Sequence, residues 1–134
     1  MVWLYKDKEV RSHADLLPQC TDFVYEIEYT DGRKYIGKKT VRGWRTLPPL
    51  KGKKRKRKVL KDQPFLKYEG SHGVEGLEVK SKTILYQCAG KKAATYLECA
   101  LLFYYNAIFE EEYLNQNISG RFFDNDLQGL LDQE

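Results

Sequence analysis

Two short segments joined by a turn signal constrain this chain more than any other feature. From Phe23 to Tyr29, aromatic and aliphatic residues occupy every second position, and two glutamates lie between them. That alternation is the period of a strand with one buried face. Residues 34–40 read as a second strand, and the Asp31-Gly32 pair between the two is a strong hairpin signal. We therefore predict a β-hairpin over residues 23–40.

The register of this hairpin decides which side chains share a face. A two-residue loop at 31–32 would put Tyr35 on the opposite face from Tyr25, whereas a three-residue loop at 30–32 puts both on one face, with Gly37 opposite Tyr25. We predict the three-residue loop with its bulge, with the loop glycine left-handed. Gly37 would then leave room for a substrate beside Tyr25. Alternatively, both tyrosines simply pack the core, as strand tyrosines usually do.

Further periodic segments complete the predicted fold. Lys82–Cys88 reads as a third strand, and residues 91–112, which lack glycine and proline, read as a long helix. Residues 1–21 are expected to be peripheral. The order of elements predicts a small α+β domain whose three-stranded, mostly antiparallel sheet, the hairpin plus the third strand, is flanked by helices. We expect a single domain over residues 1–134, with its core at about 22–120.

Positive charge is concentrated in one stretch of the sequence. The formal net charge is +4, yet residues 51–61 hold eight cations, so the rest of the chain carries about −4. We predict an exposed basic loop at about 46–62 and an acidic C-terminal tail. Dense cations suit a polyphosphate partner, because each neutralised phosphate releases counterions. A solvated loop without a partner and a nuclear-import signal are the alternatives. The expected nucleic-acid contacts are Lys53, Lys54, Arg55, Lys56, Arg57 and Lys58.

Composition narrows the classes of protein and of metal site. No window approaches the roughly 18 continuous apolar residues of a membrane span, and no signal peptide opens the chain. We therefore expect a soluble, cytoplasmic protein without a membrane partner. Three cysteines without CxxC spacing and two distant histidines argue against a zinc site. A metal would need oxygen ligands, which points to Mg²⁺ or Mn²⁺.

Two charged residues outside the basic stretch are candidates for chemistry. Glu98 falls within the apolar stripe of the predicted helix, between Ala94 and Leu101. A carboxylate there costs several kcal/mol unless it is paired, and an arginine or a divalent metal would serve equally. Arg45 follows Gly37 by eight positions. It could clamp a phosphate, or it could be an ordinary solvated arginine.

These residues, in this order, resemble the GIY-YIG nuclease superfamily, most closely the small members found in bacteriophages and mobile elements. The resemblance lies in the tyrosine that ends residues 23–25, in Tyr-Ile-Gly at 35–37, and in the later Arg45 and Glu98. Residues 68–71 also resemble a Tyr-x-Gly-Ser stretch that many of these nucleases carry. The first triplet departs from the pattern, since it reads Phe-Val-Tyr rather than Gly-Ile-Tyr.

The resemblance implies a metal-dependent endonuclease that hydrolyses phosphodiester bonds of double-stranded DNA with one Mg²⁺ or Mn²⁺ on Glu98. It implies that Tyr35 binds the phosphate or the water, and that Arg45 offsets the developing charge. Tyr25 would orient or deprotonate the attacking water. A homodimer on DNA is possible for a chain this small. The alternative is a non-catalytic nucleic-acid-binding protein that retains the nuclease fold.

Supporting roles fall to neighbouring residues. Tyrosine is a poor base at its ordinary pKa near 10, so Lys38, Lys39 or Arg45 would have to lower the pKa of the tyrosine. His72 is an alternative base, or else a solvated loop histidine. An asparagine follows the glutamate helix in the family. Asn115 and Asn117 are both candidates to support the site, and we favour Asn115.

Overall fold

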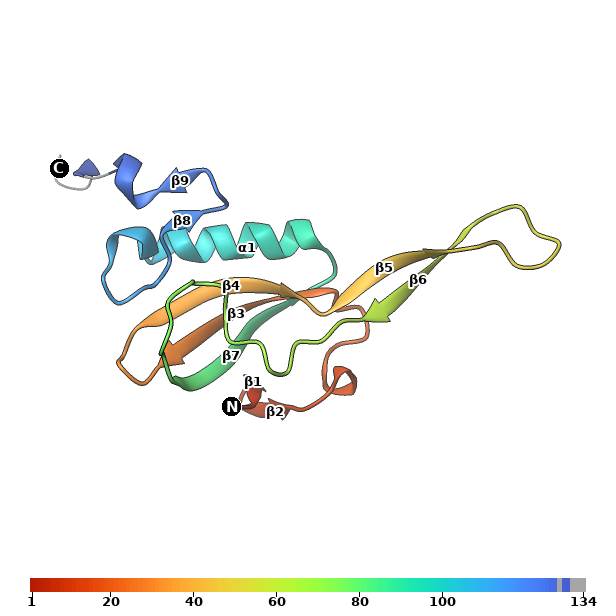
Figure 1. The fold of residues 1–134 in the computed structure, drawn as a ribbon, viewed down its shortest axis with the longest axis horizontal. Helices are drawn as coiled ribbons and strands as arrows, with labels where there is room; N and C mark the ends of the chain where they lie inside the picture. The colour runs from red at the N-terminus through yellow and green to blue at the C-terminus, as the bar shows by residue number, and fades with distance from the viewer. Residues whose placement is uncertain (128, 131–134) are drawn as a thin grey trace.

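A five-stranded mixed sheet covered by one helix forms the body of the protein (Figure 1). The computed structural model describes residues 1–127 and 129–130. The α+β prediction agrees with this architecture, but the sheet has five strands rather than three, and among the described residues a single α-helix flanks it. In spatial order the strands are β2 (Lys8–Val10), β1 (Trp3–Tyr5), β7 (Val79–Cys88), β3 (Asp22–Tyr29) and β4 (Lys34–Thr40). Strands β1 and β7 run parallel, and the other neighbours are antiparallel.

The central hairpin has the predicted register. Tyr25 pairs with Gly37 and Ile27 pairs with Tyr35. The three-residue loop at 30–32 is closed by the main chain, and its glycine has a φ of 90°. Both tyrosines therefore lie on one face of β3 and β4, as the hydrophobic alternation predicts.

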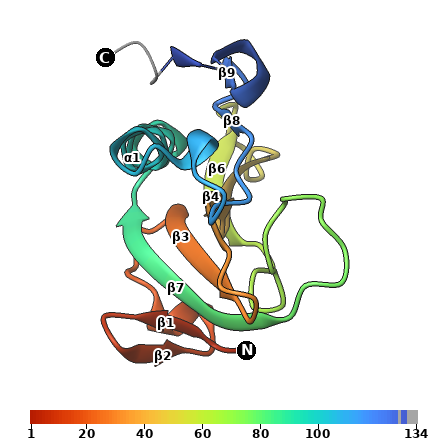
Figure 2. The same ribbon diagram turned by 90° about the vertical axis from the view of Figure 1, so that its left-hand side faces the viewer.

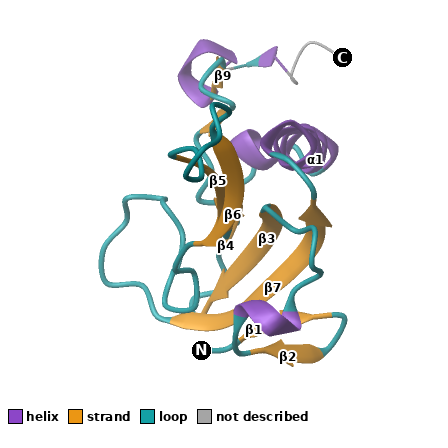
Figure 3. Ribbon diagram, turned by 90° about the vertical axis from the view of Figure 1, so that its right-hand side faces the viewer, coloured by secondary structure: helices purple, strands orange, loops and turns teal. Residues whose placement is uncertain are grey.

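Helix α1 (Lys91–Tyr104) covers one face of the sheet, and the loop over residues 63–78, which precedes β7, covers the other (Figures 2 and 3). On the helix side, Val24, Ile36 and Cys88 pack against Ala94 and Leu102. Alternate strand residues point to opposite faces, so a second core forms on the other side of the sheet. This second core is largely aromatic. Its members include Trp3, Phe23, Tyr25, Tyr29 and Phe65.

The N-terminal segment is not peripheral, contrary to the prediction. Strand β1 extends the sheet beside β7, and Trp3 is fully buried. The indole of Trp3 donates a hydrogen bond to the carbonyl of Phe65, 3.0 Å away. A three-residue strand gives too short an alternation to be detected in sequence, and its pairing with β2 and β7 identifies it.

The predicted basic loop is instead a second hairpin. Strands β5 (Arg42–Leu47) and β6 (Arg57–Asp62) pair antiparallel, and Figure 1 shows them projecting away from the sheet. Two prolines of this segment, Pro48 and Pro49, lie beyond the end of β5. Proline is tolerated there because no ladder hydrogen bond is needed from its nitrogen.

Helix α1 ends eight residues earlier than predicted. Asn106 adopts a left-handed conformation with φ 52°, and a short 3-10 turn, η2 (Ala107–Phe109), follows it. Tyr104 and Tyr105 are consequently exposed, at 79% and 42%. The chain then passes along β4, forms the small hairpin of β8 (Asn117–Ile118) and β9 (Phe122–Phe123), and reaches η3 (Asp124–Leu127). Within the described residues, no helix has the length and apolarity needed to cross a membrane.

Candidate active site

Tyr25 and Tyr35 lie side by side on the aromatic face of the hairpin. Their ring centroids are 6.2 Å apart. The phenol of Tyr25 crosses over Gly37, where an added Cβ would lie 2.4 Å from the hydroxyl oxygen. The packing of Tyr25 therefore requires a glycine at position 37. The prediction that Gly37 leaves room for a substrate is wrong, because the Tyr25 side chain fills that space.

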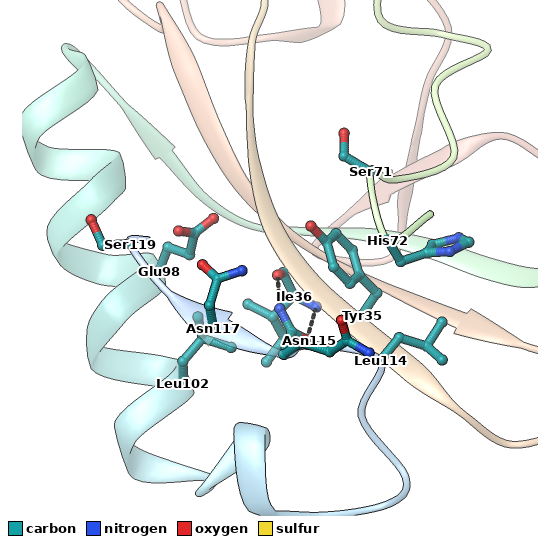
Figure 4. Close-up of a pocket in the computed structure, with 11 residues that line it drawn as sticks. Tyr35, Ile36, Ser71, His72, Glu98, Leu102, Leu114, Asn115, Asn117 and Ser119 are labelled. Carbon is teal, nitrogen blue, oxygen red and sulfur yellow. Dashed lines mark hydrogen bonds between the residues drawn. The ribbon is translucent and has the colours of Figure 1, made fainter. Parts of the chain in front are cut away.

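A cavity of about 170 Å³ opens at the edge of the sheet beside β4 (Figure 4). Because β4 is the edge strand, side chains from both faces of the sheet can meet beyond it. Tyr35 reaches the cavity from the aromatic face, and Glu98 reaches it from α1 on the opposite face. The residues after the helix close the cavity with Asn117 and Ser119. Figure 4 shows the side chains of Glu98 and Asn117 directed toward each other.

Glu98 is a half-buried carboxylate at the wall of this cavity. Burial raises its pKa above the ordinary value, while the ammonium and main-chain amide of Lys38 oppose the rise. Lys38 in turn contacts Thr95 on α1. The positive charge acting on Glu98 is thus a lysine on the neighbouring strand, not the arginine considered as its alternative partner.

The two hairpin tyrosines are held in their neutral forms. Burial is the main cause that raises the pKa of Tyr35 to about 12, with the charges of Tyr68 and Glu98 adding to it. Burial raises the pKa of Tyr25 further still. The expectation that neighbouring cations lower these pKa values is wrong, because desolvation dominates at this depth. Neutral phenols can donate hydrogen bonds and orient a water or a phosphate, but they are poor bases at neutral pH.

Tyr68 is a neighbour that sequence reasoning left out of the site. Its hydroxyl accepts a hydrogen bond from Tyr25 at 3.2 Å and contacts Ser71. The ammonium of Lys39 lies 4.8 Å from the Tyr68 ring centroid. Buried Lys82 fixes this loop by donating to the carbonyls of Leu66 and Tyr68, at 2.8 and 3.0 Å. The loop has no periodicity, and only the Tyr-Glu-Gly-Ser stretch could have marked Tyr68.

His72 lines the same cavity and stacks edge-on against Tyr35, with ring centroids 5.6 Å apart. Burial lowers its pKa, and Arg33 lowers it further. The Nδ1 atom accepts a hydrogen bond from the Val74 amide at 2.9 Å. That bond assigns the proton of a neutral ring to Nε2, which makes the ring a donor there and a poor proton acceptor.

The two candidate asparagines have different places. Asn115 is 8% exposed, and its amide is bonded to the main chain of Ile36 in both directions. Asn117 lines the cavity, and its side-chain oxygen accepts from the Gly120 amide at 3.0 Å. Asn115 therefore fixes the strand that carries Tyr35, while Asn117 faces Glu98.

The structure does not bring Arg45 to this cavity. Arg45 is exposed on β5 and lines a separate cavity of about 440 Å³ with Trp44 and Lys91. The cations close to the tyrosines and Glu98 are Lys38 and Lys39, which follow Gly37 directly. The expected basic contacts at 53–58 lie at the end of the second hairpin, away from the cavity.

The donor set of the cavity fits a hard cation such as Mg²⁺. Glu98 offers a carboxylate, and Asn117 and Ser119 add polar oxygen atoms at the same wall. Mg²⁺ commonly binds through one or two carboxylates and completes its coordination with waters and substrate phosphate. Within residues 1–127 and 129–130, no group of three or more His, Cys, Asp or Glu side chains gathers into a closed metal site.

Comparison with known families gives a match over most of the chain. The family model described as "Putative endonuclease segE, GIY-YIG domain" matches residues 3–118. That span includes both hairpin tyrosines, Glu98 and both asparagines, and also the second hairpin. No curated protein and no solved structure matches the chain.

Proposed function

The chain belongs to this GIY-YIG endonuclease family, and we propose that it is a metal-dependent endonuclease that hydrolyses phosphodiester bonds of double-stranded DNA at the cavity beside β4. The observation that carries the proposal is the meeting of Tyr35 and Glu98 in one cavity. Binding alone would not require a half-buried carboxylate whose pKa is raised by desolvation.

Glu98, assisted by Asn117 and Ser119, would hold a single Mg²⁺ or Mn²⁺ ion. Such an ion, when bound, supplies Lewis-acid stabilisation of the charge that develops on the phosphate and on the leaving oxygen. The raised pKa of Glu98 does not prevent this role, because the carboxylate is a ligand only in its ionised form and a cation favours that form.

The neutral phenol of Tyr35 would donate a hydrogen bond to the scissile phosphate or to the attacking water. Tyr25 is 1% exposed, so it would act through its neighbours by fixing Tyr68 and Tyr35. Of the two roles expected for Tyr25, orienting and deprotonating the water, the raised pKa argues against deprotonation, and burial makes any orienting effect an indirect one. Holding these groups in place before the reaction lowers the entropic part of the barrier.

Positive charge near the reacting phosphate would come from Lys39 and Lys38. Lys39 lies against the Tyr68 ring, and Lys38 acts on Glu98. Arg45, on a separate cavity, would bind a phosphate further along the same strand of DNA. One cavity of this kind cuts one strand, so a double-strand break would need a second copy of the chain or a second encounter.

Relaxation of supercoiled plasmid by the purified protein, with Mg²⁺ or Mn²⁺, tests the proposal. The natural chain should nick the plasmid, EDTA should abolish nicking, and Glu98→Gln should lower the rate by about 10²-fold or more. Glu111→Gln is the matched control, since Glu111 is an exposed carboxylate beyond the helix and should not change the rate.

Equal rates for the natural chain and Glu98→Gln would contradict the assignment of the site. Nicking that survives EDTA would contradict metal dependence. Absence of nicking by the natural chain would contradict the endonuclease proposal and favour the alternative, a nucleic-acid-binding protein that retains the nuclease fold. Nicked circles before linear DNA would indicate single-strand cuts, and linear product that rises with protein concentration would indicate a dimer.

A further inference from the structure

The second hairpin, β5–β6 with its connecting segment (residues 42–62, called the arm below), is firmly anchored at its base. The guanidinium of Arg42 donates to the carbonyls of Leu17, Cys20 and His13 at 2.7, 3.0 and 2.8 Å. It also forms an ion pair with Asp62 at 3.3 Å. These contacts tie the base of the arm to the body segment 13–20 and to its own second strand, so they fix the direction in which the arm leaves the body.

Beyond its base the arm extends free of the body (Figure 1). Within the described residues, β5 and β6 pair only with each other. Six paired residues on each strand span about 20 Å, and residues 48–56 continue past them. Trp44 is 65% exposed on this ribbon. A two-stranded ribbon with so little core is marginally stable in water on its own.

The arm is the part of the protein in which positive charge is most concentrated. It holds ten cations and one acid, a net charge of +9, so the remaining residues carry −5 of the overall +4. The body on its own would be repelled by DNA. Ten cations on one narrow ribbon also repel each other, and a polyanion relieves that repulsion.

The pairing register sorts these charges. Directly paired residues share a face of a ribbon, so Arg45, Arg57 and Lys61 lie on one face, paired with Val59, Leu47 and Gly43. The opposite face pairs Trp44 with Leu60 and Thr46 with Lys58. The tip adds Lys51, Lys53, Lys54, Arg55 and Lys56.

We propose that the arm lies in the major groove of duplex DNA and supplies most of the affinity of the protein for its substrate, while the cavity beside β4 acts on a phosphate at a fixed distance from the arm. The proposal rests on the proposed function, because it takes duplex DNA as the substrate. A two-stranded ribbon fits the major groove, which is about 12 Å wide, without deforming the duplex, whereas the minor groove of about 6 Å would have to be widened to admit it. The face with Arg45, Arg57 and Lys61 would contact phosphates along the groove wall.

Two variants remove different parts of the arm. In the first, residues 48–56 are replaced by Asn-Gly, a two-residue hairpin turn that preserves the pairing of β5 with β6. In the second, Arg45, Arg57 and Lys61 become glutamine together. The matched control changes three exposed cations elsewhere, Lys6, Lys8 and Lys67, to glutamine. Circular dichroism and urea unfolding establish that each variant is folded.

Binding to a 30-base-pair duplex is measured in EDTA on the Glu98→Gln background, so that no cleavage occurs. We expect both arm variants to bind at least about tenfold more weakly at low salt. The slope of log K against log salt should fall by about 0.9 for each phosphate that a variant no longer neutralises. The control should keep the affinity and slope of its parent. Unchanged affinity and slope in both arm variants would overturn the proposal.

Dimethyl sulfate footprinting distinguishes the grooves, because guanine N7 lies in the major groove and adenine N3 in the minor groove. Protection of guanine N7 that disappears in the tip-shortened variant is expected. Arm-dependent protection of adenine N3 alone would overturn the groove assignment. If the arm variants lost self-association in ultracentrifugation while keeping DNA affinity, the occupant of the arm would be a second copy of the chain, and the proposal would fail.

These outcomes separate the two proposals. Binding in EDTA does not require cleavage. Arm-dependent binding without any nicking by the natural chain would therefore contradict only the proposal of endonuclease activity. Metal-dependent nicking combined with arm-independent binding would contradict only the proposal that the arm binds DNA.

Discussion

Asn115 bonds to Ile36 through both ends of its side-chain amide. The oxygen accepts from the Ile36 amide at 3.1 Å, and the nitrogen donates to the Ile36 carbonyl at 2.7 Å. Ile36 lies on the edge strand between Tyr35 and Gly37. The asparagine therefore occupies the place of a neighbouring strand at this point and ties the segment after α1 to the strand of the candidate active site.

Removing this amide should destabilise the fold, whereas removing Asn117 should affect catalysis. Asn115→Ala leaves both main-chain groups of Ile36 without partners, and we expect the free energy of unfolding to fall by about 2–4 kcal/mol. Asn117→Ala, at an exposed position, should change it by less than about 1 kcal/mol and yet lower plasmid nicking. Urea unfolding and initial nicking rates check the pair. Equal stability of the two variants would contradict the assignment.

The pH dependence of cleavage should not follow the ionisation of Tyr35. Burial raises the pKa of this phenol to about 12, so it stays protonated at any pH where the protein is assayed. Tyr35→Phe should lower kcat/KM by about 10²-fold, as loss of a hydrogen-bond donor to the reacting group does. The shape of its pH profile should match that of the natural chain. An alkaline rise present only in the natural chain would identify Tyr35 as the base.

The parts of the site that sequence predicted are those fixed by local pattern. The register of the central hairpin follows from alternation and from one glycine in a turn, so Tyr25, Tyr35 and Gly37 could be placed on one face before any tertiary contact was known. Glu98 stood out because a carboxylate interrupts an apolar helical stripe. Both signals come from short-range geometry.

The parts that sequence missed depend on contacts between distant segments. Strand β1 is three residues long and joins the sheet through its pairing with β7, more than 70 residues away in sequence. Tyr68 reaches Tyr25 through a loop held by Lys82, 14 residues away in sequence. The family resemblance placed Arg45 with the tyrosines, but β5 leaves the five-stranded sheet after Val41 and pairs with β6 instead. Charge density predicted an exposed segment at 46–62, yet could not reveal that its two halves pair.

Tyr25 and Tyr68 should be energetically coupled through their hydroxyls. The bond between them, at 3.2 Å, is the one hydrogen bond found for the Tyr25 hydroxyl among the described residues. In a double-mutant cycle of Tyr25→Phe and Tyr68→Phe, we expect a coupling free energy of about 0.5–1.5 kcal/mol. Urea unfolding of the four proteins measures it. A coupling near zero would show that the two hydroxyls act independently.

Glu98 should cost the protein stability at neutral pH. Burial raises its pKa in the folded state above the unfolded value of 4.5. The folded state therefore binds the proton more tightly, and this favourable contribution is complete below the unfolded pKa and lost as pH rises through the folded pKa. Glu98→Gln should accordingly raise the free energy of unfolding at pH 7.5 in EDTA. The gain should shrink toward pH 4, where the natural carboxyl is protonated.

The same measurement distinguishes a metal ligand from a partner of Lys38. Adding Mg²⁺ should stabilise the natural chain and leave Glu98→Gln unchanged, because an ion that binds only the folded state shifts the unfolding equilibrium. Glu111→Gln, an exposed carboxylate, serves as the control and should respond to Mg²⁺ as the natural chain does. If Glu98→Gln were instead less stable than the natural chain at pH 7.5 in EDTA, the carboxylate would be a stabilising partner of Lys38. The positive charge of Lys38 would then offset the cost of burying the Glu98 carboxylate, and no metal would be needed for that.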